Sequence, residues 1–176
     1  ASDVYKRQIN GAALATPVFL SLYAENDLRL DKYFAETDEK GFRKNKKAGS
    51  NNYLCTFPVG EIYLTAAEAA ARLGELSQAR TRLLELMRKR YAPEAYEAKS
   101  VVVNAMDKEA LVQEILDERA RELAFEGHRW FDLRRSTRPR LEKVLDGTRY
   151  VLEENDARYT LAIPKEAIEA NPGLLN

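Results

Sequence analysis

The segment from residue 118 to 135, ERARELAFEGHRWFDLRR, restricts the possible folds of this chain more than any other. It contains four acidic residues, five arginines, and the only histidine of the chain. Apolar residues recur through and before it with the 3.6-residue period of a helix, at Leu111, Val112, Ile115, Leu116, Leu123 and Phe125. Asp107 stands where an N-cap is expected. We therefore predict a helix that begins after Asp107 and carries many charges that must be neutralised.

The carboxylates of this segment raise the question of metal binding or catalysis. Glu118, Glu122 and Glu126 follow each other at i, i+4 and i+8, so a continuous helix would place them on one face. Di-iron carboxylate proteins combine such faces with Glu-x-x-His motifs from several helices, whereas this chain has only His128. We also find no nucleophile elbow, glycine-rich phosphate loop or zinc-ligand spacing. The sequence gives no basis for an enzyme, a metal site or a cofactor.

Mutual pairing explains the charges better. Five arginines stand within helical reach of Glu118, Glu122, Glu126 and Asp132: Arg119, Arg121, Arg129, Arg134 and Arg135. Gly127 allows a bend before a further helical turn or two, and Trp130 and Phe131 would supply buried area beside the charges. Nucleic-acid binding is the alternative, because RRSTRPR (134–140) is locally basic, but a phosphate footprint needs more than one such turn. We therefore predict a structural role for the segment.

Length and charge set the general class. A chain of 176 residues can form one domain with a packed core. Its 28 basic and 28 acidic residues cancel, so no overall field would attract nucleic acid or an anionic membrane. One cysteine, Cys55, excludes an internal disulfide and a cysteine-based zinc site. The chain opens at Ala1 without a leader pattern, and we expect it to be one fragment, 1–176, whose amino-terminal part is missing.

Residues 59–91 predict two antiparallel helices. Apolar residues repeat with a helical period, Gly74 is suited to the left-handed position after the first helix, and Ser77 can cap the second. The small residues Ala67 and Ala79, twelve apart, resemble a tetratricopeptide unit. A single unit is too short for a stable solenoid, so this pair must pack against something else.

The remaining segments have weaker patterns. Residues 17–34 are moderately apolar, with a turn or helix start at Asn26-Asp27, and 35–52 read as a polar surface loop. Residues 92–107 read as a connector with a short extended piece at Val101 to Val103. The tail predicts two short extended pieces around Glu153 to Ala157, then a small helical turn opened by Pro164.

Residues 115–135 resemble the defining segment of the SusD/RagB family. Three further stretches agree in order: NDLRLDKYF (26–34) is similar to the family's aspartate-x-arginine segment, 60–90 to its helix pair, and 159–176 to its closing IP…NP segment. The resemblance is clearest over residues 26–176. Two features depart from the family pattern: Gly60 stands near a position that is usually arginine, which leaves Glu61 without an assigned partner, and Cys55 is internal and so cannot be the lipobox cysteine.

The resemblance implies an all-α fold of tetratricopeptide-like helix pairs, with irregular loops and short extended pieces near the C-terminus. It implies surface capture of oligosaccharides or peptides and their delivery to a TonB-dependent outer-membrane transporter, without catalysis. Localisation would be the outer membrane, through a lipid anchor on the missing segment. Structural roles would fall to Glu118, Glu122, Glu126, Gly127, His128, Arg129, Trp130, Phe131, Asp132 and Arg134.

Ligand contacts cannot be assigned in the same way. Sugar capture commonly uses aromatic rings, and Tyr5, Tyr33, Phe42 and Tyr53 stand in or near loops. An isolated loop aromatic more often packs locally, so we assign no ligand-binding residue. The alternative function is a tetratricopeptide-like module that binds a protein segment in the groove near residues 60–90.

Overall fold

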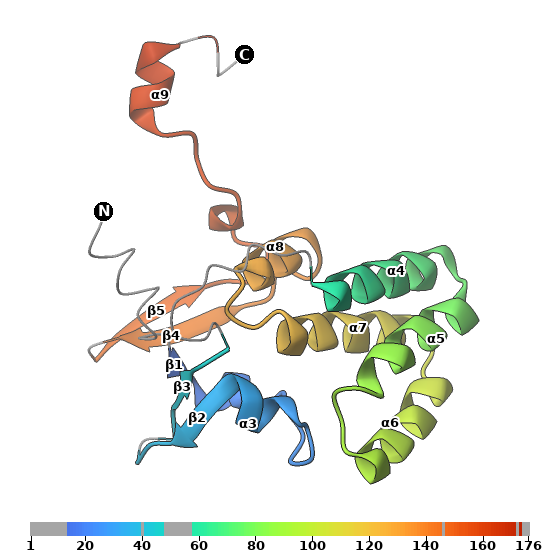
Figure 1. The fold of residues 1–176 in the computed structure, drawn as a ribbon. Helices are drawn as coiled ribbons and strands as arrows, with labels where there is room; N and C mark the ends of the chain where they lie inside the picture. The colour runs from blue at the N-terminus through green and yellow to red at the C-terminus, as the bar shows by residue number, and fades with distance from the viewer. Residues whose placement is uncertain (1–13, 40, 48–57, 146, 172, 174–176) are drawn as a thin grey trace. The chain divides into compact units, whose positions relative to one another are not determined.

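The computed structural model describes residues 14–39, 41–47, 58–145, 147–171 and 173 (Figure 1). Tyr5, Tyr53 and Cys55 lie outside these residues. The chain divides into two compact units, Ala1–His128 and Arg129–Asn176, which are described separately. The prediction of a single domain over 1–176 stays a prediction.

Helices dominate the first unit. Helix α4 (Val59–Leu73) packs against both α5 (Leu76–Met87) and α7 (Lys108–Glu122), and α6 (Pro93–Ala105) packs against α5 (Figure 1). Their shared core includes side chains with no exposed surface: Leu64, Leu83, Met87, Val103, Leu111 and Ile115. The predicted all-α fold of tetratricopeptide-like helix pairs is confirmed in that the structure is mostly helical, with small antiparallel sheets in addition.

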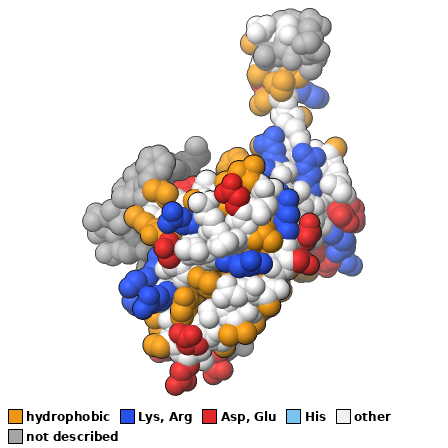
Figure 2. All heavy atoms as spheres, turned by 90° about the vertical axis from the view of Figure 1, so that its right-hand side faces the viewer, with side chains coloured by type: hydrophobic (Ala, Val, Ile, Leu, Met, Phe, Trp, Pro, Cys, Tyr) orange, Lys and Arg blue, Asp and Glu red, His pale blue; other side chains and the backbone are white. Residues whose placement is uncertain are grey.

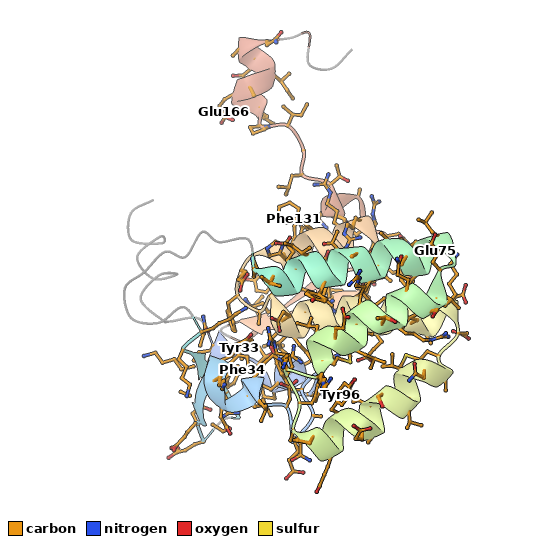
Figure 3. All side chains as sticks on the ribbon, turned by 45° about the vertical axis from the view of Figure 1, so that its right-hand side comes forward. Tyr33, Phe34, Glu75, Tyr96, Phe131 and Glu166 are labelled. Carbon is orange, nitrogen blue, oxygen red and sulfur yellow. The ribbon has the colours of Figure 1, made fainter. Side chains whose placement is uncertain are left out.

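The turn between α4 and α5 explains the helix pair. Gly74 has φ 86°, the left-handed conformation predicted for it. Its N–H donates to Ala71 O at 3.1 Å, and the next N–H, of Glu75, donates to Ala70 O at 2.9 Å, which is a Schellman motif. Glu75 is therefore the N-cap residue of α5 (Figure 3). The prediction that Ser77 caps α5 is wrong. The Schellman motif ends at Glu75, so Ser77 already lies inside the helix.

The prediction of a connector over 92–107 is also wrong, because α6 covers most of it. Pro93 occupies the first turn of α6, where its missing N–H costs nothing and its fixed φ favours the helix. Three consecutive valines locally favour a strand, but Val103 is fully buried in the helical core. Tertiary packing has overridden the local preference.

A small sheet forms the other side of the first unit. Strands β1 (Leu14–Ala15), β2 (Phe34–Thr37) and β3 (Arg43–Asn45) pair antiparallel in the order β1-β3-β2, with short helices α2 (Pro17–Leu20) and α3 (Arg29–Tyr33) between β1 and β2. The described part of the predicted loop 35–52 thus contains strands. The segment forms strands where a loop was predicted because Phe34, at the start of β2, is fully buried and fixes the chain that follows it.

Helix α7 begins as predicted, with the Asp107 side chain accepting the Ala110 N–H at 2.8 Å. It ends at Glu122, and residues 123–127 form a turn in which Phe125 and Gly127 have φ 65° and 84°. Glu126 therefore stands outside the helix. The predicted single face of three carboxylates is correct for Glu118 and Glu122 only.

The second unit consists of α8 (His128–Arg135, whose first residue ends the first unit), a hairpin of β4 (Leu141–Leu145) and β5 (Thr148–Leu152), a 3-10 turn η1 (Ala157–Tyr159) and α9 (Lys165–Ala170). The extended pieces precede Glu153 instead of surrounding Glu153 to Ala157. Asn155, at φ 57°, and the Asp156 cap of η1 end the extended conformation. Pro164 caps α9, as expected. None of the described helices is long and apolar enough to cross a membrane.

Candidate functional site

The motif carboxylate Glu118 lies at the centre of a buried group of charges in the first unit. It has no exposed surface and accepts hydrogen bonds from Arg29 Nη1 and Arg121 Nε, both at 2.7 Å. The Tyr91 hydroxyl donates to its second oxygen at 3.3 Å. Arg121 is the partner three residues along the helix that the sequence predicted, but Arg29 is 89 residues away.

Arg29 holds three segments together, although its side chain is only 2% exposed. Its Nε and Nη2 donate to the two oxygens of Asp27 at 2.9 and 2.8 Å, a bidentate pair, and Nη1 also reaches Glu122 at 3.1 Å. The guanidinium carbon lies 5.8 Å from the ring centre of Tyr23 and 5.4 Å from that of Tyr91. One cation thus ties α3 to α7 and to the end of α5.

Glu122 is bonded from two further directions. Arg90 donates to its two oxygens at 2.8 and 2.7 Å, again as a bidentate pair. Gly60, in the first turn of α4, lies so close that an added Cβ would come 2.6 Å from Glu122 Oε1. Glycine at this departure from the family pattern therefore leaves room for the Glu122 carboxylate.

The group extends along α7 toward its N-terminus. Arg121 donates to Glu114 at 2.6 Å, and Glu114 accepts from Lys99 of α6 at 2.9 Å. The Tyr23 hydroxyl donates to the backbone oxygen of Arg121 at 2.8 Å. We call the following residues the buried charge network: Asp27, Arg29, Arg90, Tyr91, Lys99, Glu114, Glu118, Arg121 and Glu122. Its carboxylates and cations are equal in number.

The pKa values follow from this arrangement. Burial alone would raise the pKa of Glu118, but the Arg29 and Arg121 guanidinium groups outweigh it and lower that pKa to about 2. Burial likewise favours the neutral form of Arg29, yet Glu118 and Asp27 raise its pKa above the ordinary value. Burial raises the pKa of the Tyr91 hydroxyl, with Glu118 adding to the effect. Glu118 and Arg29 are therefore both charged at neutral pH, while Tyr91 stays neutral.

The remaining motif residues of the first unit hold the turn after α7. Lys47 forms an ion pair with Glu126, and its ammonium lies 4.7 Å from the ring centre of Tyr33. His128 Nδ1 lies 3.6 Å from Glu61 Oε1, which gives Glu61 the neighbour that the sequence left unassigned. Gly127 provides the left-handed residue between these contacts. Lys47, like Arg29, comes from a distant segment.

The motif residues of the second unit make a separate set of contacts. Asp132 is buried and pairs with Arg135 at 2.6 Å, as predicted, and the Arg134 carbonyl accepts from Arg138 at 2.9 Å. Trp130 stacks on Tyr159 with ring centres 5.2 Å apart. Arg129 starts this unit and is half-buried. The expectation that Phe131 is buried is wrong, because Phe131 is 62% exposed (Figure 3).

This arrangement is suited to support and not to chemistry. Each carboxylate of the buried charge network accepts hydrogen bonds from cations, so none is placed as a free acid or base. Within the described ranges, no group of three or more His, Cys, Asp or Glu residues could hold a metal ion. Of the four aromatic residues considered as sugar contacts, Tyr33 and Phe42 are among the described residues, and both are half-buried.

The described side chains on the face in Figure 2 do not form a basic patch that would bind phosphate. On the face in Figure 2, Lys and Arg side chains alternate with Asp and Glu side chains. Within RRSTRPR, Arg135 pairs with Asp132 and Arg140 pairs with Glu142 at 2.9 Å. The basic run thus has acidic partners in its own unit.

A comparison with protein families identifies the group to which this chain belongs. The family model described as the SusD family matches residues 13–176. The chain belongs to the SusD family. A search of curated proteins finds no match. SusD proteins bind nutrients such as glycans, are associated with the outer membrane as lipoproteins, and are binding proteins rather than enzymes.

The SusD assignment connects three of the four resembling stretches to the geometry. Asp27 and Arg29 are the aspartate and arginine of the aspartate-x-arginine segment, Arg90 ends the helix-pair stretch, and Glu118 and Glu122 open the defining motif. Three of the stretches therefore meet in the buried charge network. Sequence reasoning missed Arg29 and Arg90 as partners because it paired charges only within helical reach.

Proposed function

We propose that this protein binds an oligosaccharide or a peptide at the cell surface and passes it, unmodified, to a TonB-dependent outer-membrane transporter. The observation that carries the proposal is the SusD match over residues 13–176, because that family consists of outer-membrane nutrient-binding proteins. The paired state of the network carboxylates supports the non-catalytic part. Lipid anchoring and exposure at the cell surface also belong to this proposal.

In this proposal the motif residues support the ligand-binding surface without touching the ligand. Glu118 and Glu122 fix α7 against α3 and α5 through Arg29 and Arg90. Glu126 and Gly127 shape the turn that follows α7, with Glu126 held by Lys47. Trp130 and Asp132 order the start of the second unit. Loss of any of these contacts would act on binding through the fold.

The test is a glycan-array screen followed by calorimetric titration, with a peptide library tested in parallel. Micromolar binding of one glycan or peptide class, together with co-purification of an outer-membrane transporter, is the expected result. Binding of folded proteins only would favour the interaction-module alternative and overturn the proposal. Turnover of a bound glycan to products would overturn its non-catalytic part.

Two variants test the scaffold role. Glu126→Gln and Arg129→Ala should lower the melting temperature, and any loss of affinity should disappear at temperatures where the variant is fully folded. A variant that kept its melting temperature and still lost the ligand would place that residue in the binding surface.

A further inference from the structure

The turn that follows α7 contains a strained residue. Phe125 has φ 65°, in the left-handed region that a bulky side chain rarely adopts. Gly127 also has a positive φ, 84°, but glycine adopts this conformation without strain. Backbone strain persists only where the surrounding structure imposes it, and it is common in segments that switch between conformations. Contacts with this turn must therefore hold Phe125 in its unfavourable conformation.

The sequence of the turn favours a different conformation. Leu123, Ala124 and Glu126 are good helix formers. The apolar period of α7 also continues as far as Phe125, and the first residue that opposes a helix is Gly127. A helix continued to Glu126 would return Phe125 to ordinary helical backbone angles. The alternative to the observed turn is thus a longer α7.

A lysine from a distant segment binds both ends of the turn. Lys47 follows β3, and its ammonium donates to the backbone oxygen of Glu122, the last residue of α7. The same ammonium forms an ion pair with Glu126. A cation at the last carbonyl groups of a helix satisfies an acceptor that has no partner within the helix and complements the helix dipole. Lys47 thus caps α7 at the point where it ends.

This cap competes with the hydrogen bond that would continue the helix. An α-helix that runs on past Glu122 needs its backbone oxygen as the acceptor for the Glu126 N–H, four residues along. In the structure the Glu126 N–H donates instead to Leu123 O at 3.1 Å, while Lys47 occupies the Glu122 oxygen. One ammonium therefore favours the turn and disfavours the longer helix.

Aromatic rings from the same distant segment hold the Phe125 side chain. Phe125 packs edge-to-face on Phe19 and Phe34, with ring centres 6.2 and 6.1 Å apart. Phe34 is fully buried, so its ring has a fixed position. Its neighbour Tyr33, labelled beside it in Figure 3, places its ring centre 4.7 Å from the Lys47 ammonium. The segment that forms the small sheet thus supplies both the cap and the ring contacts of the turn.

We propose that residues 123–127 are a two-state element, in which Lys47 selects the observed turn against a longer α7. When Lys47 moves away, the Glu122 oxygen becomes available to the Glu126 N–H, and Phe125 relaxes into the helix. The chain enters the second unit at Arg129, directly after this turn. The element therefore couples the end of β3 to the path of the chain into the second unit.

The Cα chemical shifts of residues 123–127, measured on the whole chain, test this proposal because left-handed and helical residues differ in this shift. Lys47→Met should raise the ratio of helix to turn about tenfold or more. The matched control is Lys44→Met, which removes the same charge from an exposed lysine of β3 and should leave these shifts unchanged. Equal changes in both variants, or none in Lys47→Met, would overturn the proposal.

A second pair of variants keeps Lys47 in place and so remains informative if Lys47→Met does not fold. Phe125→Gly and Phe125→Ala both remove the ring contacts, but glycine adopts a positive φ freely whereas alanine favours a helix. We expect Phe125→Gly to keep the turn and Phe125→Ala to show a higher helical population. Equal helical populations in the two variants would contradict a two-state element at this turn.

Discussion

Two ion pairs of nearly equal length show how the two units of this protein differ. Arg29 and Glu118 in the first unit are 2.7 Å apart, and Arg149 and Glu142 in the hairpin of the second are 2.6 Å apart. The exposed fractions of the side chains are 2% and 0% in the first pair but 62% and 35% in the second. Distance alone therefore says little about what a pair contributes. The buried pair must remain intact because its members have lost their water, whereas water can replace either partner of the exposed pair.

The pKa values make the same point. Arg29 and Arg121 bring the pKa of Glu118 to about 2 against the effect of burial. Asp156 in the second unit also reaches a pKa of about 2, through hydrogen bonds from Arg158, whose side chain is 66% exposed. Solvent and salt screen the surface pair, so equal pKa values do not imply equal contributions to stability.

The largest expected effect is that of Arg29→Met. It would leave Asp27 and Glu118 buried without their main cation, and breaking one side of a buried pair typically costs about 3 to 5 kcal/mol. Equilibrium unfolding in urea measures this loss. A loss of unfolding free energy as small as that expected for an exposed ion pair would contradict the distinction between the buried and the exposed pair.

The pH dependence of stability should differ between wild type and Glu118→Gln. The folded pKa of Glu118, about 2, lies below its ordinary value of 4.5. Its contribution is thus fully present above pH 4.5 and is lost as the pH falls from 4.5 toward 2. The loss should amount to about 3 kcal/mol in wild type and be absent in the variant. Melting temperatures between pH 2 and 7 test this, and parallel curves for both proteins would contradict it.

Gly60→Ala should cost about 1 to 3 kcal/mol, as overpacking in a filled core does. The added Cβ would meet Glu122 Oε1 at 2.6 Å and push that carboxylate away from Arg90. Unfolding measurements on Gly60→Ala, Glu122→Ala and the double variant separate the effect of the contact between the added Cβ and Glu122 from the effect of helix propensity. In the Glu122→Ala background, alanine at position 60 should no longer lower the free energy of unfolding. An undiminished cost there would assign the effect to another neighbour.

The smallest effect is expected for Arg149→Met, which is the matched control for Arg29→Met. Glu142 keeps Arg140 at 2.9 Å, and all three side chains stay in water. We expect no resolvable change in melting temperature, at low or at high salt. A clear, salt-sensitive drop would show that the hairpin depends on its charges.

The sequence alone determined those features that depend on neighbours along the chain. The helix pair with its glycine turn at Gly74, the start of α7 after Asp107 and the Asp132–Arg135 pair were predicted, because helical period, capping and reach within one helix are local properties. The motif gave the SusD family for the same reason, since its residues are contiguous.

Only the tertiary structure decided which charges meet in the core. Glu118 is bonded to Arg29 and Glu122 to Arg90 across 89 and 32 residues, and no periodicity within one helix reveals such partners. Tertiary packing also made a helix of the valine-rich segment 93–105, a strand of the start of the polar loop, and a turn of the residues around Phe125. In each case burying a few side chains outweighed the local preference, because desolvating a core stabilises the fold by more than the backbone propensities of a short segment.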